Sequence, residues 1–369
     1  MTGKVLFTAS TYDHLERFHK PYIDEFRRLG FETHVACAAA PERSDLADKT
    51  ISLPLKKRML SLKNFSAAGL LRRAMETERY DLVVSHTALA AFFTRLAMRR
   101  IKDRPASAVM VHGYLFGKDA PILRGLVLRL AEKLSAKQTD LLLVMNGEDL
   151  ELAQRYSLCS RIFKIPGVGV DFSRIDAPSR ERTRGELGFP EGSYVLLNAA
   201  EFSARKSQSV LTKAMQFLPG NFRLILAGTG DKLNECKKLA VRLGVSDKIA
   251  FPGRVEDIGG LMRLADAYVS ASRSEGLPFS VMEALHLGLP VAASRVKGHT
   301  DLVEEGATGA LYPYGDAKAC AQAVLSLSSL DAEAAARRAE ASVSEYSLER
   351  VLPQVMEQYL SLLRDREDK

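Results

Sequence analysis

Short apolar runs that alternate with helix-like stretches are the feature that most limits how this chain can fold. The runs span residues 5–10, 33–38, 82–85, 108–111 and 141–145 in the first half, and 194–199, 224–227, 249–251 and 267–271 in the second. Runs of this length, separated by amphipathic segments, are typical of buried strands in a parallel α/β sheet. Because the rhythm restarts in the second half, and because 369 residues exceed one typical core, we expect two doubly wound domains.

The composition is that of a globular protein, with 46% hydrophobic and 26% charged residues. No apolar run approaches the roughly 18 residues needed to span a bilayer. The first run is also too short for a signal peptide. The four cysteines lie far apart without a C-x-x-C motif. We therefore expect reduced, buried thiols and a cytoplasmic protein.

The net charge of +7 is concentrated in the first half of the chain. Residues 1–165 contain 27 Lys and Arg against 18 Asp and Glu, whereas the remainder contains 25 against 27. A basic half predicts either a solvated basic surface or an anionic partner. Charge alone leaves nucleic acid, anionic lipid and a phosphate-bearing acceptor open as partner classes.

Two acids, Glu275 and Glu283, lie on either side of a Gly-Leu-Pro turn. Gly and Pro interrupt regular structure, so we expect Glu275 in a loop and Glu283 on the helix that follows. Carboxylates accept hydrogen bonds from sugar hydroxyls, and the amides of a helix start attract phosphate. The pattern therefore suits a polyhydroxylated, anionic ligand. The alternative is a capping box from Ser280 to Glu283, which would only close the helix start.

The stretch E-G-L-P-F-S-V-M-E-A-L-H-L-G-L-P-V-A, residues 275–292, resembles the E-x7-E signature of family-4 retaining glycosyltransferases. The resemblance implies the GT-B architecture, an α/β fold of two Rossmann-like, doubly wound domains that face each other across a cleft. It implies an N-terminal acceptor-binding domain at residues 1–165 and a C-terminal donor-binding domain at residues 166–344. It also implies that a terminal helix, at about residues 345–369, crosses back to the first domain.

The second half resembles the donor-binding half of this family. The resemblance implies that Arg205 and Lys206 lie against the donor diphosphate. It implies that Glu275 binds hydroxyls of the donor sugar and that Glu283 binds the ribose. In many members the first basic residue lies earlier, where this chain has Glu201. Cations at a helix start oppose the helix dipole, so Arg205 and Lys206 also favour an arriving anion on physical grounds alone.

Other donor contacts are implied at turns of the second half. They comprise Gly230, Arg254, Gly276, Leu277, Pro278 and Phe279. The loop at residues 8–13 has no glycine and the turn at residues 228–230 has only two, so neither matches a dinucleotide fingerprint. The chain has no D-x-D motif, and along its sequence we find no clustered His, Cys and Asp ligands. We therefore expect no cofactor and no metal ion, with basic side chains in its place.

Histidines follow three of the expected strands in the first half. His14 and His19 come after the first run, His86 follows residues 82–85, and His112 follows residues 108–111. In open α/β sheets, ligands bind beyond the carboxyl ends of the strands. The alternative is that Phe18 and Tyr22 pack inward while the histidines of this first helix are solvated.

Two stretches in this half, F-H-K-P-Y-I at residues 18–23 and H-G-Y-L-F-G-K-D-A-P at residues 112–121, resemble a subgroup of the family found in capsule and exopolysaccharide assembly. The resemblance implies that His112 lines the reaction centre near the donor sugar. It implies acceptor contacts for the remaining residues, which are His14, His19, His86 and Lys118.

Basic residues and apolar residues are interleaved at residues 55–73, 95–104 and 123–137. Residues 123–137 read as an amphipathic helix with one set of apolar side chains and one set of basic side chains. The apolar set is Leu126, Val127, Leu130 and Leu134, and the basic set is Arg129, Lys133 and Lys137. Each stretch is either a core helix with a solvated face or a contact with an anionic membrane.

Taken together, the residues and the resemblance predict a retaining, metal-independent glycosyltransferase that acts in surface polysaccharide synthesis. We expect it to move a hexose or N-acetylhexosamine from a UDP-sugar to a polyprenyl-diphosphate-linked or other saccharide acceptor. We expect it in the cytoplasm, in contact with the inner face of the cell membrane, and without nucleic acid as a partner. A UDP-sugar epimerase or hydrolase on the same fold and a non-catalytic partner subunit remain alternatives. A nicotinamide-dependent oxidoreductase is disfavoured by the missing glycine fingerprint.

Overall fold

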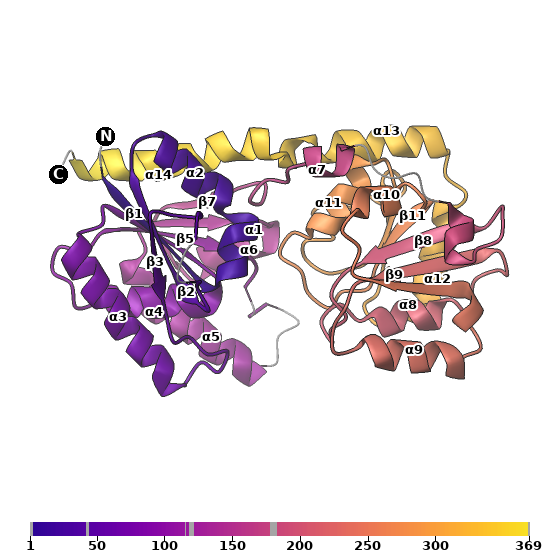
Figure 1. Ribbon diagram of the computed structural model, residues 1–369, viewed down its shortest axis with the longest axis horizontal. Coiled ribbons are helices and arrows are strands. Elements are labelled where there is room, and N and C mark those ends of the chain that lie inside the picture. Colours follow the sequence, from indigo (N-terminus) through magenta and orange to yellow (C-terminus); the bar gives the residue numbers. More distant parts are fainter. Residues whose placement is uncertain (1–2, 42–43, 115, 118–121, 178–182, 368–369) are drawn as a thin grey trace. The chain divides into compact units, whose positions relative to one another are not determined.

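The computed structural model describes residues 3–41, 44–114, 116–117, 122–177 and 183–367. Lys118, one of the residues expected at the acceptor, lies outside these ranges. The chain folds as two compact units (Figure 1). Unit 1 comprises Met1–Val168 together with Glu349–Lys369, and unit 2 comprises Gly169–Leu348.

Unit 1 is built on a parallel sheet whose described strands follow the order β3-β2-β1-β4-β5-β6-β7. The strands are β1 Lys4–Thr11, β2 Glu32–Ala38, β3 Lys49–Ser52, β4 Leu82–His86, β5 Ala106–Val111, β6 Leu141–Val144 and β7 Ile162–Lys164. The central strands are buried along nearly their whole length, as expected for a parallel sheet with helices on both faces.

The helices of unit 1 connect these strands. They are α1 Tyr12–Phe18, α2 Lys20–Arg28, α3 Leu62–Glu78, α4 Ala88–Met98, α5 Ile122–Ser135, α6 Gly147–Arg155 and the terminal α14 Leu348–Glu367. The terminal helix packs on unit 1: Tyr359 is fully buried with its ring 6.0 Å from that of Phe26, and Asp365 pairs with Arg161 at 2.7 Å. The expected return of the last helix to the first half of the chain is thus confirmed.

Unit 2 repeats the design with the strand order β10-β9-β8-β11-β12-β13. The strands are β8 Tyr194–Ala199, β9 Phe222–Ala227, β10 Ile249–Gly253, β11 Ala267–Ser270, β12 Val291–Ser294 and β13 Gly309–Tyr312, and the helices are α7 Ser173–Asp176, α8 Gln208–Ala214, α9 Leu233–Arg242, α10 Ile258–Met262, α11 Phe279–His286, α12 Ala317–Leu327 and α13 Ala332–Val343. Alternate residues of β8 enter two different apolar clusters, Leu196 one and Val195 with Leu197 the other. The sheet is therefore covered on both faces, and the expectation of two doubly wound sheets is confirmed.

Among its described strands, each sheet has one switch point, the place where the strand order reverses. It lies between β1 and β4 in unit 1 and between β8 and β11 in unit 2. The connections leave such a point in opposite directions, so the carboxyl ends of the two strands open a crevice in which ligands bind. In unit 1, α1 follows β1 and His86 ends β4. In unit 2, Arg205 and Lys206 follow β8, and Glu275 follows β11.

Candidate functional site

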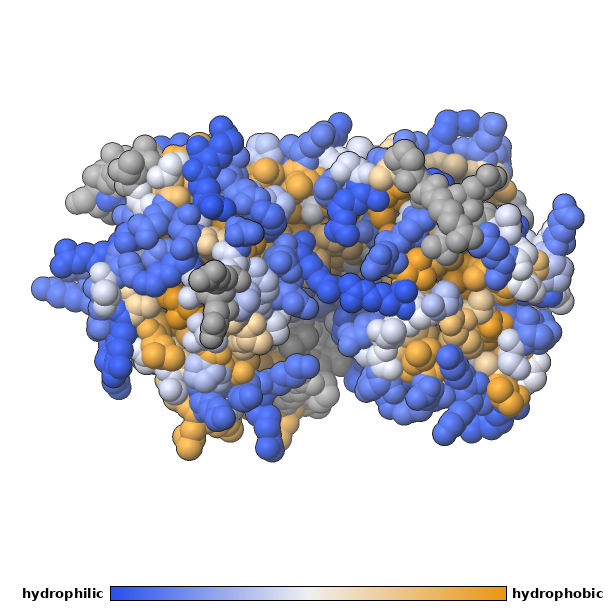
Figure 2. All heavy atoms as spheres, in the orientation of Figure 1, coloured by the Kyte–Doolittle hydropathy of each residue, from blue (hydrophilic) through white to orange (hydrophobic). Residues whose placement is uncertain are grey.

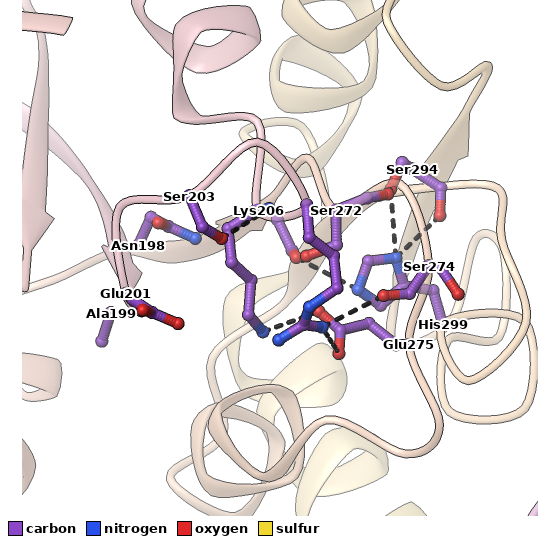
Figure 3. Close-up of polar contacts among 12 residues, drawn as sticks. Asn198, Ala199, Glu201, Ser203, Lys206, Ser272, Ser274, Glu275, Ser294 and His299 are labelled. Atoms are coloured by element: carbon purple, nitrogen blue, oxygen red, sulfur yellow. Dashed lines mark hydrogen bonds and ion pairs between the residues drawn. The ribbon is translucent and has the colours of Figure 1, made fainter. Parts of the chain in front are cut away.

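Glu275 lies in the loop after β11 with two cations directly against its carboxylate. Lys206 Nζ donates to Oε1 at 2.6 Å (Figure 3), and an Arg205 guanidinium nitrogen donates to Oε2 at 2.7 Å. Arg205 also donates to the Ser274 carbonyl at 3.1 Å, and its own carbonyl accepts from the Arg273 amide at 2.8 Å. The structure therefore joins three of the residues predicted from the sequence and ties together the loops after β8 and β11.

The carboxylate of Glu275 is ionised although only 7% of its side chain is exposed. Burial alone would raise the pKa of Glu275, but the Lys206 ammonium and the Arg205 guanidinium lower it to about 2. Lys206 is largely buried, whereas half of the Arg205 side chain is exposed. Two cations against one carboxylate leave an excess positive charge, so this group attracts an anion.

Helix α11 begins at Phe279, directly after the Glu275 loop, and Pro278 is its N-cap without a side-chain hydrogen bond. Ser280 lies inside the helix, so the capping-box interpretation of this segment is wrong. Glu283 is half-buried on the same helix; burial raises its pKa, and Arg174 opposes that shift. The backbone amides at a helix start are a suitable place for phosphate oxygens.

The turn after β9 approaches the loop after β8 so closely that only glycine fits. Gly228 has φ 138° and Gly230 has φ 149°, a region that residues with a Cβ rarely adopt. A Cβ at Gly228 would collide with the Ala200 carbonyl, and one at Gly230 would collide with the Phe202 carbonyl. These two glycines therefore let the turn lie against the chain that leads to Arg205.

His299 supports the Glu275 loop and was not singled out from the sequence. It is fully buried; Nδ1 lies 2.8 Å from the Ser294 carbonyl and Nε2 3.1 Å from Ser270 Oγ (Figure 3). At the neighbouring Gly298, with φ 79°, a Cβ would come within 2.6 Å of the Gly276 carbonyl oxygen. The sequence gave no sign of this close approach, because Gly298 and Gly276 lie on different loops.

Other residues expected at the donor are less closely joined to this group. Leu277 and Phe279 are half-buried against the apolar core of unit 2. Arg254 is exposed just after β10 and, within the described part of the chain, makes neither a hydrogen bond nor an ion pair. Glu201 is also exposed, and only its backbone carbonyl is engaged, by Gln208.

Four of the seven histidines of the chain meet at the switch point of unit 1. His14 Nε2 lies 3.4 Å from His112 Nε2, and the rings of His19 and His86 stack with their centroids 3.4 Å apart. His14, His19 and His112 each place one ring nitrogen within 4.8 Å of the others. This differs from the expectation that the chain lacks clustered ligands. The sequence concealed the cluster because its members come from α1, the α1–α2 junction, the end of β4 and the segment after β5.

His19 and His86 are fully buried, and none of their four ring nitrogens has a hydrogen-bond partner among the residues that the structure describes. The interpretation in which the histidines of the first helix are solvated is therefore wrong for His19, although Tyr22 does pack inward. Burial lowers the pKa of His14 to about 4. Burial, reinforced by the neighbouring imidazoles, places the pKa of His19, His86 and His112 well below the ordinary value. The cluster is therefore uncharged at neutral pH.

A cavity of about 220 Å³ lies beside His112 in unit 1. Its wall is mainly apolar and includes Val109, Phe116 and Leu128 of α5. Among the described residues of the wall, the one acid is Glu132, which is already paired with the buried Arg95 at 2.9 Å. No sequence pattern indicated this cavity, because its wall is assembled from segments far apart in the chain.

The apolar side of α5 is on the surface of unit 1. Its exposed apolar side chains are Leu123, Leu126, Val127, Leu130 and Leu134, and those on and before α3 are Leu60, Leu62, Phe65 and Leu70. The core-helix interpretation of residues 123–137 is therefore wrong for this face. Figure 2 shows apolar atoms beside strongly hydrophilic ones along the lower edge of this unit, where Figure 1 places α3 and α5. Among the described residues, no helix is both long and apolar enough to cross a membrane.

Two family models match successive parts of the chain. Residues 21–174 match the model described as Glycosyltransferase Family 4, and residues 179–343 match the model described as Glycosyl transferases group 1. The chain is 32% identical over 332 residues to EpsD of Bacillus subtilis strain 168, a protein that is named as a glycosyltransferase. That match covers 88% of this chain and 87% of the relative.

Two further proteins are similar over most of their length. One is named UDP-Gal:alpha-D-GlcNAc-diphosphoundecaprenol alpha-1,3-galactosyltransferase, from Escherichia coli; it is 24% identical over 300 residues, which are 78% of this chain and 77% of the relative. The other is HepE of Anabaena, solved in complex with UDP and glucose. It has a TM-score of 0.76 at 20% identity, over 97% of this chain and all of that chain. At this identity the structural likeness shows a shared fold.

Proposed function

The chain belongs to the family-4 glycosyltransferases, and on that premise we propose that it is a retaining enzyme that transfers a hexose or an N-acetylhexosamine. In this proposal the donor is a UDP-sugar, the acceptor is a lipid-linked saccharide, and the product enters surface polysaccharide synthesis. The observation that carries the proposal is the group formed by Arg205, Lys206 and Glu275 at the switch point of unit 2. It combines an excess of positive charge with a carboxylate that accepts hydrogen bonds.

The donor diphosphate would take Arg205 and Lys206 as its counter-ions. When the bond between the sugar C1 and the diphosphate oxygen breaks, negative charge grows on the departing group, and cations held in place stabilise that charge. Both cations now pair with Glu275. The half-exposed Arg205 would turn toward phosphate at little cost in desolvation, while Lys206 keeps the carboxylate ionised. These two residues would supply the charge that Mg²⁺ supplies in other transferases.

Glu275 would bind hydroxyls of the donor sugar, and Glu283, one turn into α11, would bind the ribose. A carboxyl group with a pKa of about 2 is a poor proton donor at neutral pH. This supports transfer over hydrolysis of the glycosidase type, which needs a protonated acid beside the scissile bond. The loss of a proton from the acceptor hydroxyl would then be balanced by its uptake on an oxygen of the departing diphosphate.

The choice of uridine draws support from two relatives. The Escherichia coli relative is named for UDP-galactose, and HepE was solved with UDP. The backbone around Arg254, together with the turn at Gly230, would bind the nucleotide, and the amides between Gly276 and Phe279 would face the diphosphate. The proposed donor requires no further cofactor.

The acceptor would bind to unit 1. The name of the Escherichia coli relative specifies a diphosphoundecaprenol-linked sugar, which has a polar sugar end and an apolar chain. His14, His19, His86 and His112 would contact the sugar, with His112 nearest the donor. The cavity beside His112 and the exposed apolar side chains of α5 would accommodate part of the lipid. Basic side chains between these leucines would bind an anionic membrane surface.

A donor screen with the purified full-length chain tests this proposal. Nucleotide release would be measured with a panel of nucleotide-sugars, with and without a synthetic polyprenyl-diphosphate-linked N-acetylglucosamine, and the anomeric configuration of the product would be read by NMR. We expect UDP release that requires acceptor, a retained configuration, and equal rates with EDTA or with Mg²⁺. Release without acceptor would favour the hydrolase alternative. Turnover that stops in EDTA and returns with Mg²⁺ would contradict the roles of Arg205 and Lys206.

A further inference from the structure

We propose that His14, His19 and His112 form a binding site for a late first-row divalent metal of the Zn²⁺ class. Each of these residues places one ring nitrogen within 4.8 Å of the other two. All three belong to unit 1, whereas the proposed diphosphate contacts belong to unit 2. The inferred site shares these histidines with the proposed acceptor site but not with the proposed diphosphate contacts, and metal binding can be measured without turnover.

The spacing of two of the nitrogens already suits a bound metal. Tetrahedral Zn²⁺ binds imidazole nitrogen at about 2.0–2.1 Å, which places two ligand nitrogens about 3.3–3.4 Å apart. His14 Nε2 and His112 Nε2 lie 3.4 Å apart. A nitrogen of His19 lies within 4.8 Å of the other two, so it would move by no more than about 1.5 Å to complete the third corner.

The burial of His19 is a second, independent observation. Its side chain is fully buried, and within the described ranges neither ring nitrogen has a hydrogen-bond partner. Nearly all buried polar groups in folded proteins have a partner, so an unpartnered imidazole that faces other imidazoles requires an explanation. His86 stacks on the His19 ring and limits its rotation. A metal ion would take the lone pair that His19 directs into the cluster.

The donor set selects the class of metal. Imidazole nitrogen suits Zn²⁺, Co²⁺, Ni²⁺ and Cu²⁺, whereas Mg²⁺ and Ca²⁺ require oxygen ligands. Glu132, which lines the cavity beside His112, is already paired with Arg95. Three protein ligands leave the fourth position of a tetrahedral site open, as in catalytic zinc sites. An oxygen of water or of phosphate would fill that position.

A second group of residues in unit 1 meets the same distance criterion but is already satisfied. Glu32, His34 and Glu78 lie close together. However, Lys4 bonds to both acids and Lys49 pairs with Glu78, while the two nitrogens of His34 lie 2.7 Å from the Tyr80 hydroxyl and 2.8 Å from Glu32. A metal would have to displace these partners, which makes His34 a matched control.

The test uses the untagged full-length protein after treatment with EDTA and desalting. Calorimetric titration with ZnCl₂ should show one ion per chain, and titration with MgCl₂ should show none. His14→Gln and His112→Gln should each lower the affinity for zinc at least about tenfold. Loss of a group that only hydrogen-bonds to a metal ligand already lowers metal affinity by about that factor. His34→Gln should keep the wild-type affinity. Circular dichroism without metal would establish that each variant is folded, and His14, half-buried on a short helix, tolerates replacement best.

Two outcomes would overturn the proposal. One is a wild-type chain that takes up no stoichiometric zinc. The other is an affinity that is unchanged in His14→Gln and His112→Gln, or that falls only in His34→Gln. Titration with Co²⁺ reports the geometry, because a four-coordinate site gives intense visible absorption. We expect inorganic phosphate to shift that absorption through the open position, and an unshifted spectrum would refute the open position.

Discussion

Replacement of Glu275 by Gln tests the ion-pair group at the centre of unit 2, because the structure sets the size of the expected loss. The pKa of Glu275 falls from an ordinary 4.5 to about 2 in the folded chain. At about 1.4 kcal/mol for each pKa unit, this difference corresponds to about 3 kcal/mol of stability at neutral pH. The side chain is only 7% exposed, so solvent screens the interaction little.

The pH dependence follows from the direction of the shift. A carboxyl group whose pKa is lowered by folding stabilises the folded state fully above its unfolded pKa, here 4.5. That contribution is lost as the pH falls toward the folded pKa of about 2. The difference in unfolding free energy between the wild type and Glu275→Gln should therefore be constant from pH 7 to about pH 5 and shrink below it.

Urea unfolding at several pH values measures this difference. With a slope of about 2 kcal/mol per molar urea, a loss of about 3 kcal/mol lowers the midpoint of unit 2 by roughly 1.5 M. Hydrogen exchange followed by mass spectrometry, on peptides from β8 and β11, would assign the transition to unit 2. A Glu275→Gln chain with the wild-type midpoint at pH 7 would refute the inference that the buried carboxylate and its two cations stabilise the fold.

Glu305→Gln is the matched control in the same unit. Glu305 also pairs with an arginine, Arg295, at 2.7 Å, but both side chains are half-exposed. Exposed ion pairs are screened by water and contribute little to stability. The midpoint of this variant should stay close to that of the wild type, so an equal loss in both variants would show that burial does not set the magnitude.

Three further outcomes follow from the structure. Lys206→Met should lower transfer by at least about a hundredfold by removing a cation from the departing diphosphate, measured as released UDP, while the exposed Lys238→Met should be neutral. Gly230→Ala should destabilise unit 2 and abolish donor binding in calorimetry, because its Cβ would collide with a backbone carbonyl at a φ of 149°; Gly220→Ala, where a Cβ meets nothing within 4 Å, should bind donor normally. Leu130→Glu should weaken sedimentation with anionic lipid vesicles and leave the melting temperature unchanged, because this side chain is exposed; equal sedimentation would contradict membrane contact through α5.

The sequence predicted the sheets well because a strand buried on both faces has a distinctive composition. Every expected run became a strand, and the two acids fell on a loop and a helix as the Gly-Leu-Pro turn indicated. Four strands were missed. The edge strands β3, β7 and β13 are only partly buried and lack a continuous apolar run, whereas β12 is fully buried but only four residues long. A parallel edge strand is recognised mainly by its neighbour, which the sequence does not display.

The sequence was least informative where side chains from distant segments meet. Glu275 was expected only as a loop acid, yet its carboxylate is buried because Arg205 and Lys206, about seventy positions earlier, neutralise it. The histidine cluster was likewise invisible as a unit. For α5 the sequence left open whether the apolar side is a core face or a membrane contact, because periodicity shows that a face is apolar but not what covers it.

The two switch points differ in charge. This difference bears on which parts of the proposed substrates each unit can bind. The unit 2 group has two cations and a buried carboxylate, whereas the four histidines of unit 1 are uncharged at neutral pH. Neutral imidazoles bind hydroxyls but do not neutralise a diphosphate, so the phosphates of a lipid-linked acceptor need another partner. Met59 lines the cavity beside His112, and the exposed residues 56–58 that precede it are all basic. Under the proposed function, the acceptor diphosphate would therefore bind this basic segment, with the sugar directed toward the histidines and the lipid toward α5.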